Sequence, residues 1–314
     1  MTSPVDIVAA AVSAADVPTF APRRISQGYS WAEIPRWHDG KFWFSDMYTS
    51  TLKTLDEDGK ATVVVDASSR AANTDVHIHL GGFGWLPDGR LIVNSMHEQL
   101  VLVHNGGDPD DLAVYADLSQ FAIKAINDMV VDSDGRAYIT QLGFNIFEGE
   151  EPIVSDLIVV EPDATVHAPD VPPLNCGNGI AISADGTEVY VAEVMAQKIT
   201  VIDRALDGSL SNSREFAALP FLPDGICLDE DGGVWAALPG AGHIARFTES
   251  GVTDAVPLPL EDGIGSACIL GGPDRSTLYI TAGYEVFDFD KSVREALGGI
   301  WVADVKYRGG QTRP

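Results

Sequence analysis

The sequence predicts an all-β fold, a six-bladed β-propeller in a single domain, and three observations support this prediction. One phrase recurs six times along the chain: a small or polar cluster, an apolar strand, an Asp-Gly turn and a second β-rich strand. The turn aspartates are spaced 43 to 51 residues apart, which is the period of a four-stranded propeller blade. Almost no helical stretch of the length that a parallel α/β fold needs separates the strands.

The six copies predict the first two strands of each blade and the hairpin that joins them. Asp-Gly suits such a hairpin because the turn requires positive φ. The turn aspartates are Asp39, Asp88, Asp134, Asp185, Asp231 and Asp274, the last in a looser copy. Third strands are expected at 51–56, 100–104, 156–161, 198–203 and 243–247, and fourth strands at 61–65 and 252–257.

Two segments fall outside the repeat. Residues 1–24 form an N-terminal extension that is expected to be partly helical, and the propeller is expected to occupy residues 25–314. Residues 142–152, with Phe144, Ile146 and Phe147 among acidic side chains, form a long insertion after the third hairpin. Long loops in compact domains often carry function, so this insertion is either a lid or a plain surface loop.

Charge and composition argue against several classes of partner. The formal net charge of −26 repels phosphate backbones and anionic lipids, so no nucleic acid and no membrane is expected as a partner. No apolar run approaches the roughly 18 residues of a membrane span, and the N-terminus lacks the basic start of a signal peptide. We therefore expect a soluble, cytoplasmic protein, whose oligomeric state the sequence does not define. The three cysteines, Cys176, Cys227 and Cys268, are expected to be free and buried.

Polar residues stand where the innermost strand of several blades begins. Innermost strands line the channel of a propeller, so equivalent positions of different blades converge at one mouth. These positions hold Glu33, Asn127, Asn178 and Asp224, with Gly81 and Ser266 in the second and sixth copies. Carboxylates held together repel one another and lose hydration, and a divalent cation removes both costs. Oxygen ligands favour Ca²⁺, Mg²⁺ or Mn²⁺, and Zn²⁺ also accepts carboxylates. The alternative interpretation is structural, because Asn-Gly and Asp-Gly, taken singly, are common turn formers.

Taken together, these motifs resemble the gluconolactonase, regucalcin and lactonase family, also called the senescence marker protein family. The residues that carry the resemblance are Glu33-x-Pro, Asn127-Asp, Asn178-Gly-Ile-Ala and Pro-Asp224-Gly-Ile, and it extends over about residues 30–305. The resemblance implies that Glu33, Asn178 and Asp224 bind one catalytic divalent metal ion, with Ca²⁺ the first choice, and that Asn127 contacts substrate or bound water. It also implies a metal-dependent lactonase, because family members open cyclic esters and some relatives hydrolyse organophosphates.

The chain departs from the family pattern at two positions. The usual Glu-Gly-Pro is Glu33-Ile34-Pro35, and the arginine that sugar lactonases carry two residues before Asn-Asp is Ala125. The adjacent Lys124 should point elsewhere, since neighbours on a strand alternate in direction. An apolar or aromatic lactone is therefore a better candidate substrate than an aldonolactone.

His77 and His79 are the next candidates for the site, because they lead into the second blade's mouth on one face at strand spacing. Their functional interpretation is a proton carrier or a substrate contact, and the alternative is a pair of hydrogen-bonded surface histidines. A zinc site built on the two histidines is a further alternative. Met47-Tyr48 and Gln141 follow outgoing strands and line either the pocket or its rim.

The mechanistic hypothesis is a metal that polarises an ester carbonyl while Asp224 activates water as a general base. Asn127 and Asn178 hold the carbonyl or the water in place. Two other classes stay open: different metal-dependent chemistry on the same propeller (organophosphate hydrolysis, hydration or a lyase step), and a non-catalytic calcium-binding or protein-binding propeller. The chain lacks the G-x-S-x-G motif of serine hydrolases and the P-loop motif of nucleotide-binding proteins.

Overall fold

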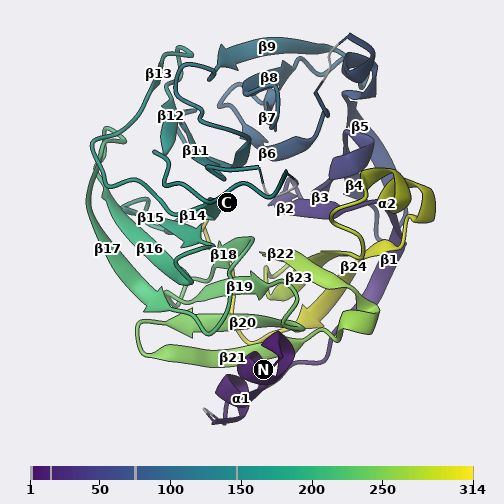
Figure 1. Cartoon of the computed structure of the whole chain (residues 1–314), viewed down its shortest axis with the longest axis vertical. Coiled ribbons are helices and arrows are strands. Elements are labelled where there is room, and N and C mark those ends of the chain that lie inside the picture. The colour runs from purple at the N-terminus through teal and green to yellow at the C-terminus, as the bar shows by residue number, and fades with distance from the viewer. Residues whose placement is uncertain (1–2, 15, 74–75, 146–147, 314) are drawn as a thin grey trace.

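The computed structural model describes residues 3–14, 16–73, 76–145 and 148–313, and it confirms the predicted six-bladed β-propeller. Six four-stranded antiparallel sheets are arranged around a central axis (Figure 1). Ile146 and Phe147 of the long insertion lie outside the described residues.

The first five blades each use four consecutive strands, with the innermost strand first. In the first two blades the strands are β2 (Ala32–His38), β3 (Lys41–Asp46), β4 (Thr51–Leu55), β5 (Ala61–Asp66), β6 (Leu80–Trp85), β7 (Leu91–Ser95), β8 (Leu100–His104) and β9 (Leu112–Asp117). In the next three they are β10 (Ile126–Val131), β11 (Ala137–Gln141), β12 (Ile158–Val160), β13 (Val166–His167), β14 (Gly177–Ile182), β15 (Glu188–Glu193), β16 (Lys198–Arg204), β17 (Leu210–Ala218), β18 (Ile226–Leu228), β19 (Val234–Leu238), β20 (His243–Thr248) and β21 (Gly251–Pro257). The third and fourth strands expected from the sequence are all present.

The sixth blade joins the two ends of the chain. It consists of β22 (Ile264–Gly271), β23 (Thr277–Gly283) and β24 (Gly298–Asp304), and its outermost strand is β1 (Arg23–Tyr29) from the start of the chain. Arg23 pairs with Val302 and Tyr29 with Gly298 in this antiparallel ladder. Closing the ring in this way ties the N-terminal strand to the last blade by backbone hydrogen bonds.

The hairpins between the first and second strands have the backbone that the Asp-Gly pairs predict. The glycine after the turn aspartate has positive φ in the first five blades: Gly40, Gly89, Gly135, Gly186 and Gly232, with φ between 72° and 89°. In the sixth blade, which lacks this glycine, Arg275 takes the left-handed position with φ of 51°. Glycine adopts such a φ without the Cβ clash that other residues pay, which explains its place in the repeat.

The core lies between the faces of neighbouring blades, where Trp235, Tyr138, Phe44 and Phe83 are among the largest fully buried side chains. The helix α1 (Pro4–Ala14) packs on the outside of the fifth blade, against β21. Its Val8 belongs to the same buried cluster as the strands of that blade. The extension is therefore anchored by apolar burial at the edge of the ring (Figure 1).

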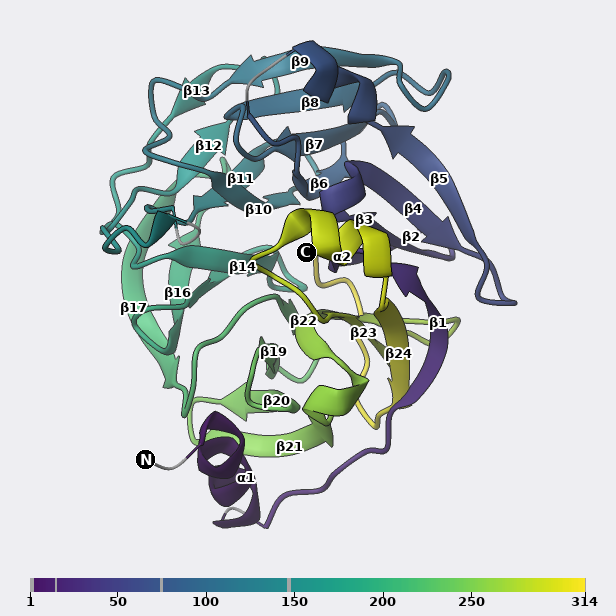
Figure 2. The same cartoon turned by 45° about the vertical axis from the view of Figure 1, so that its right-hand side comes forward.

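The second helix, α2 (Phe289–Glu295), follows β23 and lies against the short 3₁₀ turn η1 (Met47–Thr49), as Figure 2 shows. Asp288 caps it, because its carboxylate accepts the backbone N–H of Lys291 at 2.8 Å. Two more 3₁₀ turns, η2 (Ser68–Asn73) and η4 (Leu260–Asp262), lie in connections between blades. None of the helices in the described ranges is long and apolar enough to cross a membrane.

Candidate functional site

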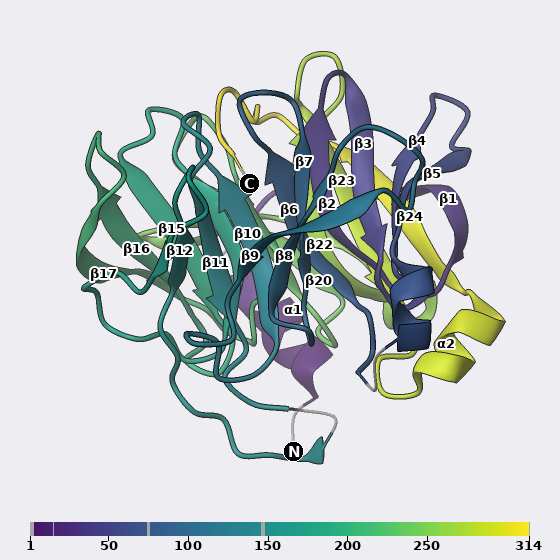
Figure 3. The same cartoon turned by 90° about the horizontal axis from the view of Figure 1, so that it is seen from above.

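The channel has two different mouths. We call the end where the innermost strands begin the site mouth, and the end with the hairpin turns the turn mouth. In the edge-on view of Figure 3, α2 projects on one side of the ring and the C-terminus lies toward the other side. Connections that follow the second strands, including residues 142–145 and 148–157, surround the site mouth.

A β-bulge marks the start of the innermost strand in five of the six blades. The register shifts between Glu33 and Arg36 in the first blade, between Ile126 and Met129 in the third, and between Gly177 and Ile180 in the fourth. The second and sixth blades have shifts of the same kind. A bulge re-aims side chains, and in the first, third and fourth blades it falls at or beside Glu33, Asn127 and Asn178.

Glu33 and Asp224, from opposite parts of the sequence, lie within electrostatic reach of each other. Burial and the charge of Asp224 hold the pKa of Glu33 well above its usual value, although hydrogen bonds from the Ile34 amide and from Ser266 oppose the shift. Burial also raises the pKa of Asp224 to about 7, against a hydrogen bond with the Asn178 side chain. No Lys or Arg forms an ion pair with either carboxylate among the residues that the structure describes. The structure thus brings Glu33, Asn178 and Asp224 together and gives the two carboxyl groups no cationic partner within the described ranges.

Asn127 lies nearby in β10, where it is buried. Its backbone oxygen accepts a hydrogen bond from the Asn94 side chain at 3.0 Å. The side-chain oxygen of Asn94 is buried and has no hydrogen-bond partner among the described residues. On the other side of β10, the Thr140 hydroxyl donates to the backbone oxygen of Asn178 at 2.7 Å and so ties the third blade to the fourth.

Glycines next to the site residues allow the innermost strands to approach closely. A Cβ on Gly179 would lie 2.5 Å from the backbone nitrogen of Ile226 and 2.7 Å from the backbone oxygen of Asp224. A Cβ on Gly225 would lie 2.1 Å from that of Ala267. Neither glycine has positive φ, so the Asn-Gly and Asp-Gly pairs of the site are close-packing positions within or beside strands and not turns.

Ile34, which replaces the glycine of the family pattern, adopts a left-handed backbone with φ of 50°. This conformation is unfavourable for a β-branched residue and costs on the order of 1–3 kcal/mol. Its amide donates to the Glu33 carboxylate at 2.7 Å. The bent backbone therefore holds the side chain of Glu33 in place, and the buried Ile34 side chain packs in the first and second blades.

Beneath the carboxylates lies a buried ion pair between Arg36 and Asp128, with 2.6 Å between Nη2 and Oδ1. Both side chains are almost fully buried. Arg36 also donates to three backbone oxygens, of Phe83, Pro35 and Met129. Asp128 lies close enough to raise the pKa of both Glu33 and Asp224. This pair compensates the charge of Asp128 and leaves the two upper carboxylates without a cationic partner.

An aromatic and imidazole cluster covers one side of the site mouth. His77 and His79 stack with ring centroids 5.6 Å apart, and His79 also contacts Tyr48 and Phe289 at 5.0 and 4.7 Å. His79 is buried, whereas His77 is exposed, and both lie in the loop that precedes β6. Burial and the charges of Glu33, Glu285 and Asp224 raise the pKa of Tyr48, which places this cluster beside the carboxylates.

His97 is a member of this cluster that the sequence did not single out. Its Nε2 lies 3.2 Å from Nδ1 of His79. Burial lowers the pKa of His79 to about 3 and that of His97 to about 4, so both imidazoles are neutral at physiological pH. A neutral pair can share one proton across this contact and leave the other ring nitrogens for a ligand.

A small cavity of about 180 Å³ opens beside His97. Ala125, which stands at the position of the family's arginine, borders it together with apolar Leu142 and Phe144 and with polar Gln99, Lys124 and Asn145. Lys124, which was expected to point elsewhere, also borders this cavity, and its ammonium group forms an ion pair with Glu150 at 2.7 Å. Gln141 is not a free pocket residue, because its side chain binds the backbones of Ile123, Phe121 and Asp156 and joins two mouth loops.

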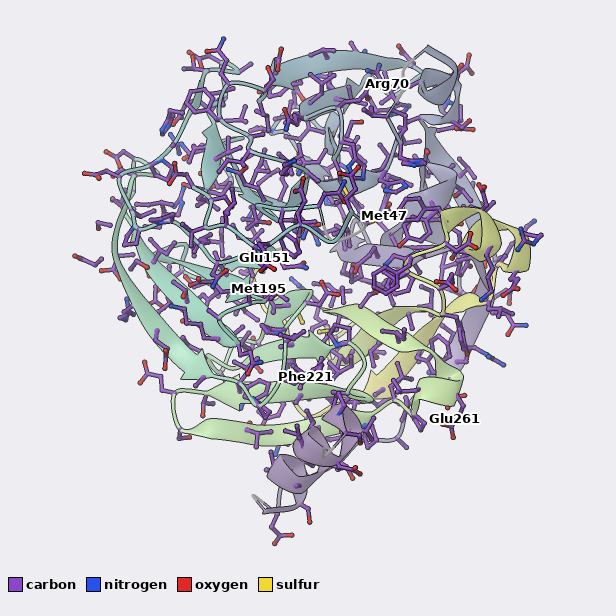
Figure 4. The ribbon with its side chains drawn as sticks, viewed as in Figure 1. Met47, Arg70, Glu151, Met195, Phe221 and Glu261 are labelled. Carbon is purple, nitrogen blue, oxygen red and sulfur yellow. The ribbon has the colours of Figure 1, made fainter. Side chains whose placement is uncertain are left out.

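The rim of the site mouth is apolar in several places. Exposed apolar side chains stand on its loops: Val76, Ile123, Ile153, Val154, Met195 and Phe287. Figure 4 shows Met47 and Met195 on opposite sides of the central opening, with Arg70 and Glu261 far from it. Exposed apolar side chains therefore share the entrance of the acidic site with acidic ones such as Glu151, which Figure 4 labels close to the opening.

The residues present fit a divalent cation. Glu33 and Asp224 are carboxylates with no cationic partner among the described residues, and Asn178 adds a neutral oxygen donor, a combination that hard divalent ions favour. No group of three His, Cys, Asp or Glu side chains within the described ranges is placed to hold a metal ion. The histidine cluster is therefore no zinc centre of its own. The cysteines are free and buried as predicted.

The fold and the mouth together define a six-bladed propeller with an acidic axial site. The sequence matches the SMP-30/Gluconolactonase/LRE-like region over residues 31–284, and the chain belongs to this family. It is 32% identical over 169 residues to L-arabinolactonase from Azospirillum brasilense, a match that covers 52% of this chain and 55% of that protein. The chain thus spans about half the length of this curated relative.

Two solved structures have the same fold. A luciferin-regenerating enzyme superposes with a TM-score of 0.72 at 19% identity, over 90% of this chain and 94% of that one. A calcium-binding protein, regucalcin from Agrobacterium tumefaciens, superposes with a TM-score of 0.70 at 19% identity, over 93% and 96% of the two chains. At this level of identity the superpositions establish the fold alone.

Proposed function

We propose that this protein is a divalent-metal-dependent hydrolase that opens a lactone with an apolar or aromatic body. The observation that carries the proposal is the pair of carboxylates, buried Glu33 and half-buried Asp224, beside an aromatic and imidazole cluster. The likeness to L-arabinolactonase supports lactone opening as the reaction. The apolar residues around Ala125, where sugar lactonases carry arginine, support the choice of substrate.

Glu33, Asn178 and Asp224 would hold the metal, and Ca²⁺ fits this all-oxygen set best. When bound, such an ion supplies a Lewis acid that polarises the ester carbonyl.

The side chains of this chain divide the remaining tasks. Asp224 accepts the proton of the attacking water, and Asn127 orients the water or the carbonyl. His79 serves as a hydrogen-bond partner for the substrate, because an imidazole with a pKa of about 3 is a poor proton acceptor at neutral pH. Exposed His77 stacks on His79 and borders the entrance, where it contacts the substrate at the rim. Tyr48, Phe289 and the apolar rim exclude water from the apolar part of the substrate.

A lactone panel tests this proposal. Dihydrocoumarin, δ-valerolactone and D-glucono-1,5-lactone are assayed by acid release, after chelation and after return of Ca²⁺, Mg²⁺, Mn²⁺ or Zn²⁺. We expect chelation to abolish turnover, Ca²⁺ to restore it, and kcat/KM for dihydrocoumarin to exceed that for gluconolactone at least about tenfold. Asp224→Asn should lower kcat/KM by about 100-fold or more, about 2.7 kcal/mol of barrier.

The matched control is Asp231→Asn, which changes the same residue type in the hairpin turn of the same blade. It should leave kcat/KM within about twofold of the wild-type value. Full activity in metal-free protein would contradict the metal requirement, and a preference for gluconolactone would contradict the apolar substrate.

A further inference from the structure

The turn mouth of the channel is crossed by the C-terminal segment 308–313. The backbone of this segment pairs with the hairpin ends of three blades: Arg308 accepts from Glu230 at 2.8 Å, Gly309 donates to Arg275 at 2.9 Å, and Arg313 exchanges two bonds with Ile182 at 2.7 and 3.0 Å. Thr312 adds a side-chain bond to the backbone oxygen of Leu228 at 3.1 Å. Figure 1 accordingly shows the C-terminus near the centre of the ring.

Between this segment and the ends of β2, β6, β10 and β22 lies a cavity of about 370 Å³. Its flat walls are aromatic: Trp37 borders it, and His38 stacks on Trp85 with ring centroids 3.7 Å apart and planes 7° apart. Leu86, Pro87 and Val131 add apolar surface. The volume is within the range of small-molecule pockets, and Ser133, Gln311 and Thr312 add polar groups to the lining.

Two guanidinium groups in this cavity have no carboxylate partner. Arg275 donates to the backbone oxygens of Leu270 and Gly310 at 3.3 and 2.6 Å, and Arg313 to that of Val131 at 3.2 Å. Neither forms an ion pair within residues 3–14, 16–73, 76–145 and 148–313. Arg275 is half-buried and Arg313 is exposed, and both line the cavity, so their guanidinium groups can donate to an anion that enters it.

The other charged groups at the cavity are already paired. Arg36 is neutralised by Asp128 at 2.6 Å, and Asp132 by two arginines of the third and fourth blades. His38 lies 3.4 Å from the exposed Asp39. The net charge that faces the cavity is therefore positive, in a protein whose overall charge is −26.

We propose that the cavity at the turn mouth binds a small aromatic carboxylate, with its ring against Trp37 and the His38–Trp85 stack and its anionic group on Arg275 and Arg313. Guanidinium groups suit carboxylates because they offer several donors in one plane. The carboxylate replaces the missing partner of the two arginines, and the aromatic body displaces water from the apolar walls. This site lies at the opposite end of the channel from the carboxylates of the site mouth and is independent of the reaction proposed there.

Calorimetric titration with 2-naphthoate tests the proposal. The buffer contains a chelator, so that no cation at the site mouth can hold the carboxylate. We expect a saturable isotherm with one site per chain, much weaker heat with acetate or inorganic phosphate, and no binding of the neutral 2-naphthamide. In Arg313→Gln the affinity for 2-naphthoate should fall at least about tenfold.

Arg308→Gln is the matched control, because Arg308 lies in the same segment and outside the cavity. The affinity of this variant for 2-naphthoate should stay within about twofold of the wild-type value. Arg275 also holds the segment through Gly310, so Arg275→Lys, which keeps the charge, serves as the second variant and should weaken binding less than Arg313→Gln. Absence of saturable binding, equal affinity for the amide, or unchanged affinity in Arg313→Gln would each overturn the proposal.

Discussion

Replacement of Gly179 by alanine should separate two blades at the metal-binding side of the channel. The new Cβ would lie 2.5 Å from the nitrogen of Ile226, 2.7 Å from the oxygen of Asp224 and 2.9 Å from Cα of Gly225. All three atoms are backbone, so no side-chain rotation can relieve the contact, and the innermost strands must part by roughly 0.5 Å or more. Overpacking costs typically 1–3 kcal/mol, and the rigid neighbours place this case at the upper end, at about 3 kcal/mol.

The same displacement moves Asn178 and Asp224 relative to Glu33, and a shift of about 0.5 Å exceeds what a preorganised site tolerates. We therefore expect Gly179→Ala to lower the free energy of unfolding of the metal-free protein in urea by about 3 kcal/mol. Its Ca²⁺ affinity, measured by calorimetry, should fall at least about tenfold. Gly232→Ala is the control: it has φ of 78° and open space around its Cβ, so it should lose about 1 kcal/mol without a change in Ca²⁺ affinity. Wild-type stability and affinity in Gly179→Ala, or an equal affinity loss in both variants, would refute the close-approach argument.

Three further predictions concern the packing around the site. The pKa of His79 is about 3 in the folded protein and about 6.5 in the unfolded chain, so the unfolded chain binds a proton first as pH falls. Between pH 7 and 5 the free energy of unfolding in urea should therefore fall by about 2 kcal/mol more for the wild type than for His79→Gln. Equal losses would show that His79 is not held neutral. Arg36→Met should lower the free energy of unfolding by about 3–5 kcal/mol, because it leaves Asp128 buried and unpaired. The control Arg214→Met, which breaks an exposed ion pair, should lower it by less than about 1 kcal/mol. A similarly small loss in both variants would contradict the burial argument. Val8→Ala on α1 should lower the free energy of unfolding by about 2 kcal/mol, since Val8 is fully buried. Replacement of the exposed Ile7 by alanine should change it by less than about 0.5 kcal/mol. Equal effects would mean that α1 does not pack on the fifth blade.

The order of the blades and their hairpins could be read from the sequence because the determinants are local. An Asp-Gly pair fixes a turn within four residues, and the alternating strands beside it differ little from copy to copy. The positions at the start of the innermost strands follow from this repeat, so Glu33, Asn178 and Asp224 could be named before any coordinates. The outermost strand of the sixth blade, β1, could not be assigned in this way, because its partner β24 is separated from it by most of the chain.

Several parts of the site had no local signal. His97 follows the second strand of its blade and meets His79 only because the two connections converge at the same mouth. Asn94 likewise has no distinguishing signal in the sequence, because its hydrogen bond to Asn127 forms only when the second and third blades pack together. The left-handed backbone of Ile34 contradicts the preference of its residue type, so only the surrounding bulge and packing reveal it.

The sequence by itself determined the repeat, the number of blades and the polar residues that begin the innermost strands, because periodicity, turn chemistry and residue type are properties of short segments. Tertiary structure alone decided which charges find partners. Among the residues that the structure describes, Arg36 compensates Asp128 across 92 positions, Glu33 and Asp224 converge without an ion-pair partner, and Arg275 and Arg313 border one cavity without such a partner. Charge pairing acts through space over a few ångströms, so it depends on how six blades close into a ring and not on neighbours along the chain.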